Sequence, residues 1–426
     1  MLNLRRSNKK GVTPSSARPE VHPRLGNRAL GYDEMEGFSW ARPVITIWPL
    51  KVCGYCGREN DDASTHCHEC GTEFPIPPSP NSEVEQQPPP PSTLINLGQI
   101  EGAFDFRDGF SRPDWKVIRQ SVEATVDSAE RPEAWDEAVI QWLVQLQGEL
   151  GGDYRLRTSR HFAFLSSLDK NMSQRLLNFS EGAITSIRES LGQVAWGSRA
   201  GVHVVILFAE EDDYYQYIAD FYREGTHVKS AGIHINTGYP HIALIFDSEL
   251  RAAQTIIHEL AHHCLNHLPV PLWLNEGVAV VLQKAIGGYS PPSYQGAASA
   301  YWGMVSGWKS PVIWAELAEK HHEFWNEEQI QHFWAGTSFH EPGDAVQLSY
   351  SLAEILVNLL AKNREDFLAF IRCARREDAG QTAALDCLGT CLGDAAGTFL
   401  GEGNWRPQRK AIKACWETKR TSQEQK

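Results

Sequence analysis

The middle of this 426-residue chain alternates between strand-like and helix-like patterns of apolar residues. Short apolar runs bounded by turn residues are typical of buried strands. Four segments have this character: residues 154–165, 203–208, 231–235 and 241–246. Between these runs, apolar residues recur at helical spacing over residues 172–196 and 213–222. The pattern predicts an α+β fold with a small mixed sheet.

Beyond the last of these strands the apolar positions follow a helical period. The run from Ile256 to Leu265 predicts a buried helix that ends near Leu268, because Pro269 and Pro271 cannot continue it. A second apolar helix follows directly. Further helices are expected at residues 302–308, 314–320, 327–333, 344–361, 367–372 and 383–388. The C-terminal part of the chain is therefore predicted to be a helical subdomain.

The first of these helices contains His258-Glu259-Leu260-Ala261-His262, which has the HExxH pattern. Two imidazoles four residues apart project from the same helix face, so both can bind a single metal ion. Zinc suits imidazole nitrogen and keeps one position open for water when only three protein groups bind it. Glu259 stands beside the first histidine, where it can accept a proton from that water. The alternative is an exposed helix with two solvated histidines, but the apolar neighbours of the motif predict burial.

Glu276 lies on the second helix and is the only ionisable side chain between His267 and Lys284. An isolated carboxylate in a buried helix costs free energy unless a partner compensates it. A hairpin through the two prolines would return Glu276 toward His258 and His262 as a third ligand. Two histidines and one glutamate around an open position form a known hydrolytic zinc set. The alternative is a glutamate that caps the start of its helix.

The segments HELAHHCLNH and PLWLNEGVAVVLQ together resemble the gluzincin branch of zinc metallopeptidases, especially the compact peptidase MA-like domains of bacteria. The resemblance covers roughly residues 150–400. It implies a zincin-like catalytic domain in which His258, His262 and Glu276 bind a catalytic zinc ion. It also implies that Glu259 is the general base.

Two further expectations follow from this resemblance. MA-like domains often carry a tyrosine near the metal, at the start of a helix, and Tyr350 is the best match. Its hydroxyl could donate a hydrogen bond to the oxyanion of a tetrahedral intermediate, and the alternative is an ordinary core aromatic. A strand edge within residues 231–246 is expected to pair with an extended substrate. His234 and His241 of these strands are interpreted as polar strand residues and not as ligands.

A second metal motif lies near the N-terminus. It consists of Cys53, Cys56, Cys67 and Cys70. Two CxxC pairs with ten residues between them make a compact zinc ribbon, and four thiolates close the coordination sphere, so this zinc is structural. A redox pair or disulfides are the alternative. The segment resembles short ribbons that bind nucleic acid, bind protein or only cap a chain.

The composition of the chain bears on its cellular location and on its partners. No apolar run reaches the length of a membrane span, and no signal peptide is visible. The five cysteines outside the ribbon lack the paired spacing of a disulfide scaffold. These observations predict a cytoplasmic protein without a membrane partner. The net charge is −13 although residues 1–30 and 405–426 are basic, and such an acidic body argues against a nucleic-acid enzyme.

The expected organisation has five parts. They are a basic arm (residues 1–48), the zinc ribbon (49–76), a proline-rich linker (77–100), the peptidase MA-like domain (101–400) and a basic tail (401–426).

The predicted function is a zinc-dependent metallopeptidase that hydrolyses a peptide or protein substrate through a zinc-bound water, with Glu259 as general base. One alternative is a non-catalytic module on the same scaffold, in which the ribbon binds a protein or nucleic acid. Another is zinc-dependent hydrolysis of a non-peptide amide. The sequence leaves the identity of the substrate open.

Overall fold

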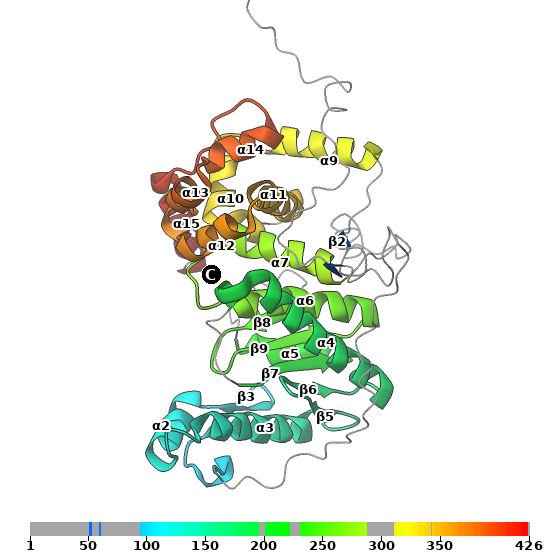
Figure 1. Cartoon of the computed structure of the whole chain (residues 1–426). Helices are drawn as coiled ribbons and strands as arrows, with labels where there is room; N and C mark the ends of the chain where they lie inside the picture. Colours follow the sequence, from blue (N-terminus) through cyan, green and yellow to red (C-terminus); the bar gives the residue numbers. More distant parts are fainter. Residues whose placement is uncertain are drawn as a thin grey trace, which may run out of the picture. The chain divides into compact units, whose positions relative to one another are not determined.

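The computed structural model describes residues 51–52, 59–60, 94–195, 201–221, 231–287, 311–341 and 343–424. Within these residues the chain has a mixed α+β architecture, as its apolar pattern predicts. One part contains a five-stranded sheet, and the part that follows the sheet in sequence is helical (Figure 1). Among the described helices, none combines the length and the apolar composition that crossing a bilayer requires.

The five-stranded sheet has the strand order β5-β6-β7-β9-β8. Its strands are β5 (Arg155–Thr158), β6 (Phe162–Ser166), β7 (His203–Phe208), β8 (Gly232–Ile235) and β9 (His241–Ile245). The three inner strands are parallel, and each edge strand runs antiparallel to its neighbour. The sheet is therefore mixed, and β8, not β9, forms the edge within the 231–246 segment.

Helices cover both faces of this sheet. They are α3 (Arg131–Leu150), α4 (Lys170–Leu191), α5 (Glu211–Ala219) and α6 (Glu249–Leu265). Successive residues of a strand point to opposite faces. Phe162 and Phe164 accordingly pack in one apolar cluster with α4 and α6, whereas Ala163 and Leu165 pack in another with α3 and α5. Burial on both sides explains why the inner strands are continuous apolar runs.

The helices after α6 form a second, all-helical part. They are α7 (Leu272–Ile286), α9 (Pro311–Phe324), α10 (Gln329–Ala335), α11 (Asp344–Leu360), α12 (Arg364–Cys373), α13 (Gln381–Leu388) and α14 (Leu392–Leu400). α7 packs between α6 and α11 (Figure 1). Gly277 permits the close approach to α11, since a Cβ there would lie 2.7 Å from both the Ala353 carbonyl oxygen and Val357 Cγ2. The predicted helix at 302–308 lies outside the described residues.

The folded body begins before residue 101. The elements are η1 (Leu97–Gln99), the hairpin of β3 (Phe104–Arg107) and β4 (Phe110–Pro113), and α2 (Trp115–Thr125). Ile95 and Leu97 are buried in an apolar cluster with Ile118 of α2 and Ala138 of α3. The end of the predicted linker at 77–100 is therefore part of the core, because two of its apolar side chains are buried there.

The folded body also continues past residue 400, where a basic tail is predicted. α15 (Arg409–Glu424) packs on α10, with Ile412 fully buried. The Trp416 indole donates to the Ala335 carbonyl (2.8 Å), and the Trp334 indole donates to the carbonyl of Trp405 (2.8 Å). Although α15 is rich in charged residues, Ile412 and Trp416 share one helix face and form an apolar stripe.

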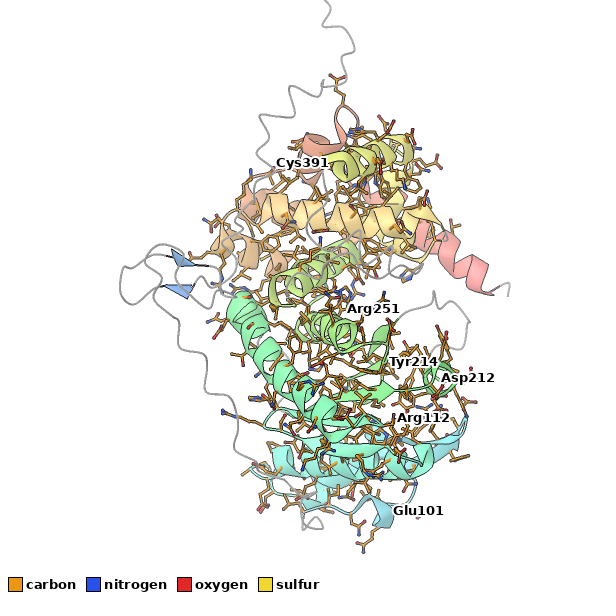
Figure 2. All side chains as sticks on the ribbon, turned by 90° about the vertical axis from the view of Figure 1, so that its right-hand side faces the viewer. Glu101, Arg112, Asp212, Tyr214, Arg251 and Cys391 are labelled. Carbon is orange, nitrogen blue, oxygen red and sulfur yellow. The ribbon has the colours of Figure 1, made fainter. Side chains whose placement is uncertain are left out.

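A buried polar network lies on the α3 side of the sheet. It starts at Arg112, labelled in Figure 2, whose guanidinium lies 4.5 Å from the ring centroid of Tyr217 and donates to the Tyr217 carbonyl (2.8 Å). The Tyr217 hydroxyl lies 2.8 Å from His241 Nε2. His241 Nδ1 donates to the Tyr239 carbonyl (2.7 Å), so His241 Nε2 accepts from the hydroxyl. Both ring nitrogens of His241 therefore have protein partners.

Candidate metal centre

The two helices of the predicted site form a hairpin. α6 begins at Ser248, whose hydroxyl accepts from the backbone N–H of Arg251 (3.4 Å). It ends before the two prolines, and α7 begins directly after the second of them, at Leu272, and packs back along α6. His258 and Glu259 are only 5% and 8% exposed. The chain therefore places the HExxH motif in the interface between α6 and α7.

Three side-chain atoms converge in this interface. Nε2 of His258 lies 3.1 Å from Nε2 of His262. Oε2 of Glu276 lies 3.3 Å from the first nitrogen and 3.4 Å from the second. Within the described residues, no other group of three or more His, Cys, Asp or Glu side chains comes together in this way. The structure thus brings the three predicted ligands to one point.

The spacing of these atoms fits a tetrahedral zinc site. Ligand bonds of about 2.0–2.1 Å at tetrahedral angles put the donor atoms about 3.3 Å apart. Two imidazole nitrogens and one carboxylate oxygen are also a donor set that zinc accepts. Oε2 of Glu276 is buried and makes no hydrogen bond. A cation between the three atoms would give this oxygen the partner that a buried carboxylate requires.

The same three groups are coupled by charge. Burial alone would raise the pKa of Glu276, but the neighbouring imidazoles of His262 and His258 outweigh it and lower that pKa. Burial alone would lower the pKa of His262, but the Glu276 carboxylate, with a smaller contribution from Glu259, raises it to about 9. The cluster therefore favours a positive charge next to its carboxylates, which either a proton or a metal cation supplies.

Glu259 lies beside this cluster and reaches the edge of the sheet. Burial raises its pKa, and the adjacent imidazoles partly offset that effect. Its carboxylate accepts a hydrogen bond from the backbone N–H of His234 in β8. Because Ala231 and Ile245 form a hydrogen-bonded position of the antiparallel ladder and such positions alternate, His234 directs its N–H away from β9. The side of β8 that faces away from β9 therefore adjoins the motif.

Tyr350 of α11 reaches the cluster from the opposite helix. Its ring centroid lies 6.5 Å from that of His258, and its hydroxyl hydrogen-bonds to Glu276. Burial raises its pKa well above 10, and the charges of Glu276 and Glu259 raise it further, so the hydroxyl keeps its proton and is a hydrogen-bond donor. The ring also packs edge-on against Phe339 (5.2 Å between centroids). Tyr350 is thus packed in the core and close to the cluster.

The remaining histidines near the motif pair with other groups. Nε2 of His234 lies 3.2 Å from Nδ1 of His263, and burial lowers the pKa of His263 to about 4. His241 belongs to the network on the other face of the sheet, and His267 is exposed. Cys264 is fully buried, and burial raises its pKa to about 12. The structure brings none of these residues into the three-atom cluster.

Two amide residues beside the cluster were not predicted. Oε1 of Gln283 lies 3.2 Å from Nδ1 of His258. The side chain of Asn275 interacts with the His262 ring and raises its pKa, although neither Asn275 Oδ1 nor His262 Nδ1 has a partner at hydrogen-bond geometry. A signal was present, because Asn275 and Gln283 are, with Glu276 and Lys284, the polar side chains of an otherwise apolar helix.

Around the second predicted metal site, the structure describes only two short strands that flank the first CxxC pair. The four residues of this site, Cys53, Cys56, Cys67 and Cys70, lie outside the described residues. The strands β1 (Lys51–Val52) and β2 (Glu59–Asn60) are described, and they pair antiparallel on either side of the first CxxC. The structural zinc at the ribbon stays a prediction, as does the character of the arm at residues 1–48.

No protein-family model matches this sequence, and the searches of curated proteins and of solved structures found no match either. The resemblance to gluzincins therefore rests on the two motif segments. Function has to be inferred from the cluster of His258, His262 and Glu276, and from its neighbours Glu259 and Tyr350.

Proposed function

We propose that this chain is a zinc-dependent metallopeptidase of the gluzincin type, with His258, His262 and Glu276 as the zinc ligands. The observation that carries the proposal is the convergence of their three donor atoms at separations of 3.1, 3.3 and 3.4 Å. A bound zinc ion lowers the pKa of water and polarises a carbonyl group, which is the chemistry that amide hydrolysis needs. The protein residues around it would supply proton transfer, substrate alignment and charge stabilisation.

Glu259 is the proposed general base. It accepts a proton from the attacking water and then delivers it to the amine that leaves. Its position supports this role, because it follows the first ligand directly and its carboxylate faces the rim of the sheet. The backbone N–H of His234 holds that carboxylate in place.

The outer edge of β8 is the proposed substrate platform. Gly232 and His234 occupy the non-hydrogen-bonded positions of the β8–β9 ladder, so their backbone groups face away from β9. An extended peptide that adds along this edge as a further strand would have to share or displace the hydrogen bond that the His234 N–H donates to Glu259. A backbone aligned there passes next to Glu259, which favours a peptide over a compact amide as the substrate.

Tyr350 is the proposed donor to the developing oxyanion. Its protonated hydroxyl interacts with Glu276 in the structure, so it lies within reach of the atoms that would surround a polarised carbonyl. A preorganised donor stabilises the charge that develops on the carbonyl oxygen in the transition state.

The substitution Glu259→Gln tests the assignment of the base. It keeps the shape of the side chain but removes its capacity to accept a proton, so we expect hydrolysis to fall by about 10²–10⁴-fold while zinc stays bound. Cleavage would be followed by mass spectrometry on a mixture of unstructured peptides, with zinc measured in the same samples. Wild-type cleavage rates in the variant would exclude Glu259 as the base.

Metal content tests the ligand sets. We expect two zinc ions per wild-type chain, one lost in His262→Ala and the other lost in Cys67→Ser. A wild-type chain with one zinc would remove one of the two sites from the proposal. Zinc that depends on His262 without cleavage of any peptide would favour the non-catalytic alternative.

A further inference from the structure

We propose that Gln283 is a positioning residue that fixes the tautomer and the orientation of His258, so that its Nε2 presents a bare lone pair to the cluster. This inference rests on the proposed zinc site. It adds to that site a residue whose side chain would not touch the metal but would set the tautomer and the orientation of the ligand His258.

The hydrogen bond defines the proton position. Oε1 of Gln283 lies 3.2 Å from Nδ1 of His258. A carbonyl oxygen only accepts hydrogen bonds, so Nδ1 carries the hydrogen and, in the neutral ring, Nε2 does not. Gln283 is only 5% exposed, so water does not readily replace it as the acceptor.

The placement of Gln283 on α7 makes the arrangement rigid. It lies seven residues after Glu276, about two helical turns along the same face. Glu276 meets the Nε2 side of the His258 ring at 3.3 Å, and Gln283 meets the Nδ1 side at 3.2 Å. One helix therefore holds the ring from both sides, and a shift of α7 moves both contacts together.

The acceptor is an amide, and this choice has a chemical consequence. A carboxylate in the same position would make the imidazole a more basic donor, since it stabilises positive charge on the ring. The neutral amide fixes the ring without that effect. The second ring has a similar neighbour, because Asn275 interacts with His262. The carboxylate of Glu276 lies 3.3 Å from Nε2 of His258 and 3.4 Å from Nε2 of His262.

Two near-isosteric substitutions with opposite expected effects test the role of Gln283. Gln283→Met removes the acceptor, and we expect zinc affinity at the His262-dependent site to fall by about 10–100-fold. Gln283→Glu supplies a charged acceptor, and we expect tighter zinc binding than in wild type. Affinity would be measured on the full chain by competition with a chelator of known strength. A packing role alone would weaken binding in both variants or in neither.

Imidazole ¹⁵N NMR of the metal-free full chain reports the tautomer directly. We expect the His258 hydrogen on Nδ1 in wild type and a mixture of tautomers in Gln283→Met. A wild-type His258 with its hydrogen on Nε2 would overturn the inference, because the amide would then be a donor.

Gln331→Met is the matched control. Gln331 of α10 is also buried and donates to the Arg406 carbonyl (3.0 Å) while accepting from the Gln408 N–H (2.8 Å). We expect it to lower stability and to leave zinc affinity unchanged. If Gln283→Met does not fold, the zinc affinity of Gln283→Glu is the deciding measurement. Unchanged or weaker zinc binding in that variant overturns the inference. Wild type without His262-dependent zinc refutes the proposed function itself, whereas normal zinc binding that is insensitive to both Gln283 variants refutes only the role of Gln283.

Discussion

The two faces of the five-stranded sheet bury histidines in very different ways. On the α3 side, both ring nitrogens of His241 pair with protein groups, namely the Tyr217 hydroxyl and the Tyr239 carbonyl. On the α6 side, two Nε2 atoms face one another at 3.1 Å, and the Glu276 Oε2 between them makes no hydrogen bond. Burial of a histidine is therefore not the mark of a metal site. Convergence of two imidazole nitrogens and one carboxylate oxygen on one point is the informative feature.

The largest effect is expected from Glu276→Gln, which should abolish metal binding on the α6 side and leave the α3 side unchanged. The substitution removes the anion from the α6-side cluster, and we expect the His262-dependent zinc to be lost completely, because an amide oxygen is a far weaker zinc ligand than a carboxylate. His241→Asn, on the other face, should retain full zinc content while losing stability. Both would be measured by elemental analysis after dialysis, with thermal unfolding of the same samples. Full zinc in Glu276→Gln would show that the cluster is not the ligand set.

The next largest effect is expected in the pH dependence of stability, to which the buried His241 contributes. Burial lowers the pKa of His241 to about 4, below the unfolded value of about 6.5. As pH falls, the unfolded chain takes up the proton first, so the free energy of unfolding decreases between about pH 6.5 and pH 4 and levels off below. The full loss from this residue is of order 3 kcal/mol.

Urea unfolding of wild type and His241→Asn over this pH range measures that loss. The variant should show a shallower decline than wild type, although other buried histidines still contribute to its slope. Equal slopes in wild type and His241→Asn would contradict the assignment of a neutral, buried His241.

Gly277→Ala should have the smallest of these effects. The new Cβ would lie 2.7 Å from the Ala353 carbonyl and from Val357 Cγ2, so α7 or α11 must move, at a cost of about 1–3 kcal/mol. Gly182→Ala in α4 is the matched control because its Cβ meets nothing within 4 Å, and it should stabilise by about 0.5–1 kcal/mol. Chemical denaturation of both variants measures the difference. Equal stability changes would mean that the α7–α11 contact is not tight.

The features that could be predicted from the sequence are those that depend on residues close together in the chain. The register of His258 and His262 on one helix follows from helical spacing, and β7 coincides with the predicted run at 203–208 because burial on both faces makes a strand uniformly apolar. Glu276 was recognisable because it is the only ionisable side chain between His267 and Lys284.

Other features depend on contacts that are remote in sequence. The identity of β8 as the edge is decided by its pairing with β9 and by the position of β9 beside β7. Arg112 is buried because rings from several segments surround its guanidinium. The segment that forms α15 was predicted to be part of a basic tail because of its charges, whereas its buried residue Ile412 is recognised only from the packing of α15 on α10.

The hairpin of α6 and α7 has a consequence for the order of folding. All three proposed ligands fall within residues 258–276, so bringing them together closes only a short loop and costs little chain entropy. The sheet is slower to assemble in principle, because β7 has to insert between β6 and β9 through long-range parallel pairing. A metal ion that binds the hairpin first would give the nascent chain a stable nucleus.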